Sequence, residues 1–208
     1  MTTQAATVNK PKQDLAVVQT IQKLRDAYAD APQIAKTALE NKIHDLASHA
    51  SVSRSRMESA GRSGSRQGTV SELTLILTFA PGGARRLRAL LEAHNGNFDD
   101  ADKVGTVHNM RFVFLDNDTK MLFATAYDGD WDPYIDDFAT KIPDIMDIAF
   151  SAFEGWPGIH SPEVKGWIAK HQVTADGWFV ANPNLTVTKT RQLEKVGNAV
   201  DELLDKVG

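Results

Sequence analysis

A change in the spacing of apolar residues constrains this chain more than any other feature. The change falls at a segment rich in serine, glycine and arginine, residues 51–68 (SVSRSRMESAGRSGSRQG). Apolar residues recur at helical spacing before this segment, whereas after it they alternate as in a strand. The segment has hardly any apolar side chain to offset the entropy lost on ordering, so we expect a flexible linker over residues 51–69. The sequence therefore predicts an N-terminal helical segment at 1–50 and a folded domain at 70–208.

The N-terminal segment contains two runs of apolar residues at helical spacing. Pro32 separates the two runs. A proline inside a helical pattern ends or bends the helix, because it has no amide hydrogen to donate. We therefore expect a hairpin of two amphipathic helices, with apolar positions at Leu15, Val18, Ile21, Leu24 and Tyr28, and then at Ile34, Ala38, Ile43 and Leu46.

The first part of the folded domain reads as a strand, a helix and a strand pair. The strand begins at Val70 and has apolar residues on both faces, as in a strand that is covered on both sides. Residues 84–94 then predict a helix, and residues 106–115 and 120–127 predict a hairpin. The next helix is expected to begin at Asp132 and Pro133, with the aspartate as N-cap and the proline in the first turn.

The last part of the domain alternates between helical and extended patterns. Residues 143–154 predict either one helix or a short helix that runs into a strand. Helices are also expected at residues 162–171 and 186–206, with a short strand at 178–181 between them. With this fourth strand, the order becomes β-α-β-β-α-β. The predicted fold class is therefore α+β, with a ferredoxin-like domain preceded by an N-terminal helical hairpin.

Composition excludes several classes of protein. The chain has no cysteine, which excludes disulfides, thiolate metal sites and a cysteine nucleophile. It also lacks a glycine-rich phosphate loop, a nucleophile elbow and a zinc signature. Its longest apolar stretch, residues 73–80, is far shorter than the ~20 residues of a membrane helix, and the N-terminus has no apolar signal region. We expect a cytoplasmic protein that does not enter a membrane.

The net charge of −4 combines +4 in residues 1–69 with −8 in residues 70–208. Arginines 54, 56, 62 and 66 of the linker would suit nucleic acid or an anionic surface, but an acidic sheet would repel phosphate. We therefore do not expect a nucleic-acid partner. The basic linker is interpreted either as a plain spacer or as a tether to a partner or to the acidic domain of a second subunit.

Several separated stretches of the domain look familiar. They are VHNMRFVFLD, MLFATAYDGDWDPYIDDF, the GWPG turn and WIAKHQVTADGWFVANPNLTV. Together they resemble ferredoxin-like, dimeric α+β-barrel proteins related to the dye-decolourising peroxidase superfamily, over roughly residues 70 to 206. The resemblance implies a homodimer and, for the peroxidases of the group, a haem cofactor. Two departures stand out: the family strand reads His-Phe-Ala-Arg where this chain has His108-Asn109-Met110-Arg111, and the Gly-x-x-Asp-Gly haem motif has no clear counterpart.

His108 and Arg111 are the leading candidate site residues. A neutral imidazole can ligate haem iron or move protons, and a guanidinium can bind a haem propionate or polarise peroxide. Each also has an ordinary structural interpretation, His108 as a hydrogen-bonded core histidine and Arg111 as a partner of an acidic residue. Because residues three apart in a strand point to opposite faces, the two can share a pocket only if a bulge lies between them.

Two further residues complete the candidate site. Asp128 lies in the Tyr-Asp-Gly turn and is a candidate acid or base, and His160 follows the GWPG turn and could approach a cofactor from a loop. Asp128, Asp130 and Asp132 have the spacing of a calcium loop, but Pro133 and Ala139 stand where such a loop needs glycine and glutamate. We expect no metal site there, and interpret these aspartates as a turn and a helix N-terminus.

Two functions remain open on the sequence. One is a haem-dependent, peroxidase-like oxidoreductase with catalytic candidates His108, Arg111 and Asp128 and cofactor-binding candidates His108, Arg111 and His160. The other is a non-enzymatic dimeric binding module whose N-terminal helices engage a protein partner. A homodimer is expected in both, because an open sheet with an apolar face must cover it.

Overall fold

The computed structural model of the chain describes residues 15–48 and 57–207. The chain divides into two compact units, Met1–Arg54 and Ser55–Gly208. This boundary falls inside the segment predicted as a linker. Residues 1–14, 49–56 and 208 lie outside the described residues, so residues 51–56 of the predicted linker are not tested.

The first unit is the predicted helical hairpin. Helix α1 spans Leu15–Ala27 and α2 spans Gln33–Ser48, with Pro32 between them as expected. Arg25 of α1 donates two hydrogen bonds to Glu40 of α2, and the closer of these N–O distances is 2.7 Å. Ile43 is buried in this hairpin. The proline and the apolar spacing were sufficient to predict both helices.

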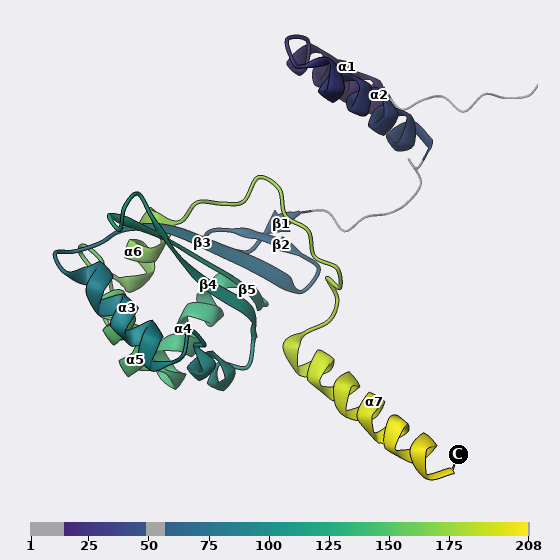
Figure 1. Cartoon of the computed structure of the whole chain (residues 1–208). Helices are drawn as coiled ribbons and strands as arrows, with labels where there is room; N and C mark the ends of the chain where they lie inside the picture. The colour runs from purple at the N-terminus through teal and green to yellow at the C-terminus, as the bar shows by residue number, and fades with distance from the viewer. Residues whose placement is uncertain (1–14, 49–56, 208) are drawn as a thin grey trace, which may run out of the picture. The chain divides into compact units, whose positions relative to one another are not determined.

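The second unit is built on a five-stranded antiparallel sheet with the order β1-β2-β3-β5-β4 (Figure 1). Its strands are β1 (Glu58–Ser59), β2 (Ser65–Gln67), β3 (Val70–Thr78), β4 (Val107–Leu115) and β5 (Lys120–Asp128). The long pairing of β3 with β5 runs from Val70 opposite Asp128 to Thr78 opposite Lys120. Strand β4 pairs with the other side of β5 and forms one edge of the sheet.

The helices of this unit follow the predicted order with small shifts. They are α3 (Gly83–Ala93), α4 (Trp131–Lys141), α5 (Pro143–Phe150), α6 (Val164–His171) and α7 (Val187–Val207), with a 3-10 turn η1 at Asp99–Lys103. Helix α4 begins before the expected position: Asp130 is the N-cap and Asp132 lies in the first turn. No helix among the described residues combines the length and apolar character needed to cross a membrane.

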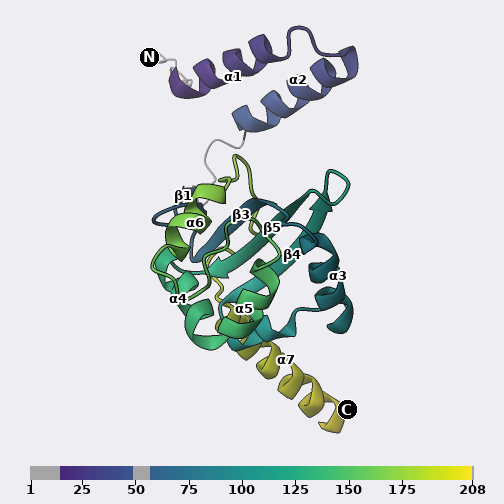
Figure 2. The ribbon, with the colours of Figure 1, turned by 90° about the vertical axis from the view of Figure 1, so that its left-hand side faces the viewer.

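One face of the sheet packs on helices to form the core. Figures 1 and 2 show α3, α4 and α5 on the same face of β3, β5 and β4. The alternate residues Leu73, Leu75 and Leu77 point into this core, where Met121 and Phe123 lie on the neighbouring strand. The helices contribute Leu87, Trp131, Tyr134, Ile135, Phe138, Met146 and Phe150.

The described part of the predicted flexible linker is folded. Residues 58–67 form β1 and β2, which extend the sheet beyond β3. Arg66 pairs with Asp130 and Glu58, and Arg62 pairs with Asp132 at 3.2 Å. The linker prediction is therefore wrong for residues 57–69, because ladder hydrogen bonds and ion pairs to distant aspartates order a segment that has few apolar residues.

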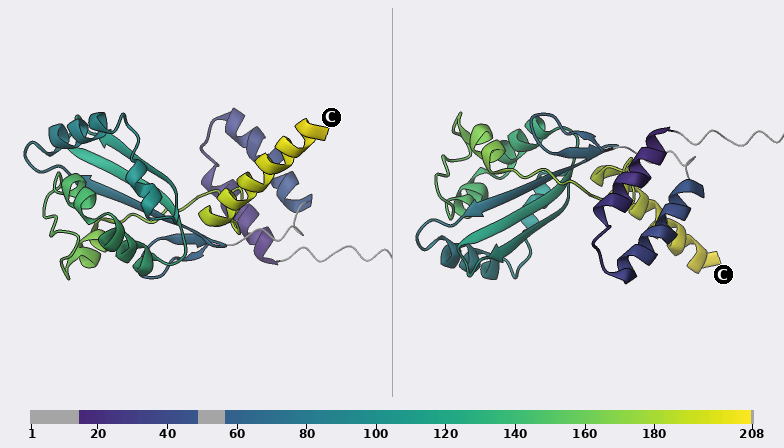
Figure 3. Two further views of the ribbon diagram at one scale, coloured as in Figure 1. Left: turned by 90° about the horizontal axis from the view of Figure 1, so that it is seen from below. Right: turned by 90° about the horizontal axis from the view of Figure 1, so that it is seen from above.

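The predicted fourth strand at residues 178–181 does not form. The position beside β3 is taken by β2 at one end and by a bridge between Leu75 and Gln172 further along. The amide of Val173 also donates to the carbonyl of Thr74 at 2.9 Å. The segment that continues to α7, seen in Figure 3, is extended without being part of the sheet. The fold is thus α+β with an open antiparallel sheet, without the predicted fourth strand.

Candidate functional site

A β-bulge at His108 shapes the candidate site. Val107 pairs with Tyr127 and Asn109 pairs with Ala126, so His108 is an extra residue on β4 with no partner of its own in the ladder. A bulge re-aims the side chains around it and breaks the strict alternation of a strand. His108 and Arg111 both line a cavity at this edge strand, which is lined by every residue from Val107 to Phe112. The bulge is the irregularity that the sequence required for the two side chains to lie on one face.

Asp128 orients the His108 ring. The Nε2 atom of His108 lies 2.8 Å from Oδ1 of Asp128, and the two side chains are 23% and 11% exposed. A carboxylate can only accept, so the hydrogen lies on Nε2 in the neutral ring. The lone pair of Nδ1 is then available to take a proton or to bind a metal ion. A histidine that donates its other N–H to a carboxylate is the usual arrangement for both tasks.

Asp128 is held by a second contact from far along the chain. Its Oδ2 atom accepts a hydrogen bond from the backbone amide of Val187 at 2.8 Å, at the start of α7. The aspartate therefore joins the end of β5, the bulge on β4 and the first turn of α7. Sequence reasoning placed Asp128 in the site but did not foresee the contact with Val187, because nothing in the local pattern relates the two.

The cavity beside His108 has a volume of about 520 Å³. It lies between the edge strand β4 and the segment that joins α3 to β4, and its lining includes Phe98, Phe112 and Met110 together with Asp99 and Asp102. Phe98 and Phe112 have ring centroids 5.4 Å apart. Arg111 is exposed and makes no hydrogen bond or ion pair in the described part of the chain. The cavity thus has an oriented histidine and a cation without a partner in the described residues, while the Phe98–Phe112 ring pair lies on the core-facing side of β4.

His160 lies apart from this group. It is exposed in the loop between α5 and α6 and does not line the His108 cavity. The structure therefore brings His108, Arg111 and Asp128 together and leaves out the fourth predicted residue. The other two aspartates of the turn have structural partners: Asp130 pairs with Arg66, and Asp132 pairs with Arg62 and Lys165.

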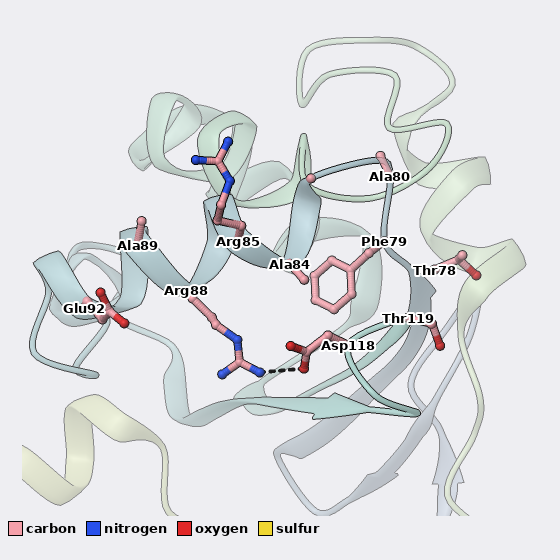
Figure 4. A pocket seen from close by; sticks show the side chains of 11 residues that line it. Thr78, Phe79, Ala80, Ala84, Arg85, Arg88, Ala89, Glu92, Asp118 and Thr119 are labelled. Carbon is pink, nitrogen blue, oxygen red and sulfur yellow. Dashed lines mark hydrogen bonds and ion pairs between the residues drawn. The ribbon is translucent and has the colours of Figure 1, made fainter.

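A second cavity, of about 670 Å³, was not predicted (Figure 4). Arg85, Arg88, Phe79 and Thr119 are among its lining residues. Figure 4 shows Arg88 directed at Asp118, while Arg85 points away from this pair. The Arg88 guanidinium also lies 4.1 Å from the centre of the Phe114 ring. The three arginines of the 84–94 segment were the available signal, but no local pattern identified a partner for them.

A histidine and two aspartates gather at the end of α3. His94, Asp99 and Asp100 have ligand atoms within 4.8 Å of one another. Asp100 also pairs with Lys103, and the His94 ring lies 5.4 Å from that of Phe98. This cluster is partly exposed and one of its acids already has a cationic partner. It is accounted for as an ion-paired turn, of which only Asp99 lines the His108 cavity.

The comparisons with known proteins give no relatives. No family model, no curated protein and no solved structure matches the chain. The function is therefore argued from the geometry of the site.

Proposed function

We propose that this protein is a haem-dependent oxidoreductase of peroxidase-like type, with its site at the cavity between β4 and η1. The observation that carries the proposal is the His108–Asp128 pair at 2.8 Å beside a cavity that Arg111 shares. Haem iron is commonly held by one histidine whose second ring nitrogen is hydrogen-bonded.

The residues present fit this group. Nδ1 of His108 is the free ring nitrogen and would face the iron, while Asp128 fixes the tautomer and the plane of the ring. Arg111, without a partner in the described residues, would bind a propionate bidentately. Phe98 and Phe112 also line the cavity, but their rings lie on the core-facing side of β4, opposite Arg111. When bound, the haem would supply the redox chemistry, and the His108 and Arg111 side chains would hold it and exclude competing reactions.

The test is the absorbance of the full chain mixed with haemin. The proposal predicts a sharp Soret band that titrates to one haem per chain, and peroxide-dependent oxidation of an electron donor by the loaded protein. A spectrum that equals the sum of free haemin and protein would contradict the proposal. Arg111→Ala is expected to weaken haemin binding while the position of the Soret band stays unchanged, because the iron ligand is kept.

A second candidate function is a dimeric binding module that uses the N-terminal helices. The observation that favours it is the set of exposed apolar residues on α1, on α2 and in the turn between them, namely Leu15, Val18, Tyr28 and Ile34. Its test is the removal of residues 1–54, which spares the second compact unit, because removal of residues 1–69 would also delete β1 and β2. The module predicts that this shorter protein stays folded and loses its partner.

A homodimer remains part of both proposals. Figures 1 and 2 show no helix of α3 to α5 on the second face of the sheet. By register this face carries Ile76, Leu122 and Val113, of which Val113 is 41% exposed. A two-fold pairing of such faces is a common way to cover them.

A further inference from the structure

One face of α7 carries apolar side chains at heptad spacing. Leu193, Val196, Val200 and Leu203 follow one another at intervals of three, four and three residues. Each of these four side chains is between 46% and 59% exposed. They occupy consecutive a and d positions of a coiled coil, with Leu193 and Val200 at a. Among the described residues of the second unit, nothing covers this stripe.

Among the described residues, the polar contacts between α7 and the rest of the unit all lie in the first turns of the helix. The Val187 amide donates to Asp128, and Arg191 pairs with Asp102 at 2.6 Å. Leu204, which adjoins the stripe, is also 59% exposed. The helix is therefore anchored at its start, and the apolar stripe is presented by the turns that follow.

The charges of α7 are placed so that a second copy of the same helix is not repelled. Its acidic residues lie at the outer b, c and f positions, and they are Glu194, Asp201, Glu202 and Asp205. The flanking e and g positions carry only one charge, and they are Thr190, Gln192, Gly197, Ala199, Leu204 and Lys206. Charges at e and g usually select an unlike partner. Their near absence here, with small residues at 197 and 199 that allow close approach, favours pairing of like with like.

We propose that α7 pairs with α7 of a second copy of this chain as a parallel, two-stranded coiled coil. The second heptad, with Val200 at a and Leu203 at d, suits two parallel strands, whereas the first heptad has the reverse order, with Leu193 at a and Val196 at d. The stripe spans only two heptads, which is too short to hold two chains together alone. In a parallel pair both anchored ends lie side by side, so the two folded units can add contacts. An antiparallel pair would separate them by up to the ~30 Å length of the helix.

This inference gives the proposed homodimer a surface that is separate from the second face of the sheet, and it does not depend on haem. It is tested without haemin, by sedimentation of the full chain over a range of concentrations. We expect a dimer that dissociates on dilution, and Val200→Glu is expected to weaken it by about tenfold or more, because it buries a charge in each helix. The matched control is Asn198→Glu, which adds the same charge on the outer face. A monomeric wild type, or a Val200→Glu protein that dimerises like Asn198→Glu, would overturn the proposal.

The lack of cysteine allows a second test that does not rely on a destabilising change. In a parallel, in-register pair each a residue faces its own copy, so Leu193→Cys should form a disulfide-linked dimer under mild oxidation. Asn198→Cys, on the outer face, should not. If Leu193→Cys cross-links no more than Asn198→Cys, the parallel coiled coil is wrong. That result would not bear on the haem proposal, since neither Leu193 nor Asn198 lines the His108 cavity.

Discussion

Asp128 accepts hydrogen bonds on both carboxylate oxygens, from His108 Nε2 on Oδ1 and from the Val187 amide on Oδ2, each at 2.8 Å. The two contacts fix the carboxylate in place, and the carboxylate fixes the imidazole. This relationship joins the proposed site to the C-terminal helix. It also gives the site several consequences that can be measured.

Asp128→Asn should weaken haemin binding without abolishing it. The amide is nearly the same size, but it lacks the charge and can present its N–H₂ group to the ring, so the tautomer of His108 is no longer fixed. When a metal-ligating histidine loses the partner of its second ring nitrogen, the affinity for the metal commonly falls 10- to 100-fold. Haemin titration followed by absorbance measures the change. Equal affinity for the two proteins would show that Asp128 does not position His108.

Val187→Pro should disturb the site from α7. Proline removes the amide hydrogen that Asp128 accepts, yet it is well tolerated in the first turn of a helix. A hydrogen bond to a charged group contributes about 1.5–3 kcal/mol, so we expect a loss of that order in the free energy of unfolding and weaker haemin binding. Val187→Ala is the control, because it keeps the amide. If Val187→Ala and Val187→Pro lose equal stability and equal haemin affinity, the loss comes from the valine side chain and not from the hydrogen bond to Asp128.

Glu72 should be essential for the hairpin of β1 and β2. This buried side chain accepts hydrogen bonds on Oε1 from the amides of Ser65 and Ala175, at 3.1 and 3.2 Å. Glu72→Ala leaves these donors unpaired, at a cost of about 1–3 kcal/mol for each that stays buried. Urea unfolding should show this loss, and proteolysis within residues 57–69 should become faster. Glu163→Ala, at an exposed position, should change the free energy of unfolding by less than about 0.5 kcal/mol.

The Glu72 contacts also explain why the sequence misjudged the linker. The composition of residues 57–69 indicated disorder, because it offers little apolar area. The order comes instead from Ala60, which is completely buried, and from bonds to Glu72, Asp130 and Asp132. These partners are remote in sequence, and no local pattern identifies them. By contrast, the helices and β3 to β5 follow from period and turn residues alone, and the structure confirms them.

The sequence was sufficient to choose the candidate site residues, but it did not predict how they are arranged in space. His108, Arg111 and Asp128 were singled out from motifs, but strict alternation placed His108 and Arg111 on opposite faces. The bulge that unites them is a property of the pairing between β4 and β5. The absence of the predicted fourth strand also depends on strand pairing. Strand β2 pairs with the edge of β3, so this part of the edge is not available to residues 178–181.

Two buried tyrosines predict how stability depends on alkaline pH. Burial raises the pKa of Tyr127 and of Tyr134 well above the ordinary value near 10 for a phenol. In the unfolded chain both ionise near their ordinary pKa, so unfolding releases protons in alkaline solution. The stabilisation is complete below about pH 10 and is lost as the pH rises further. Urea unfolding at about pH 8 and pH 11 should show this fall, which Tyr127→Phe should reduce. A fall of equal size in both proteins would contradict the assignment.

The most direct test of the proposed function is a haemin titration of the wild type, His108→Ala and His160→Ala, compared in one experiment. His108 is the residue that Asp128 orients in the cavity, whereas His160 lies exposed in a loop outside it. The proposal predicts a Soret band for the wild type and for His160→Ala, and its loss in His108→Ala. A band that survives in His108→Ala, or no band in the wild type, would contradict haem binding at this site.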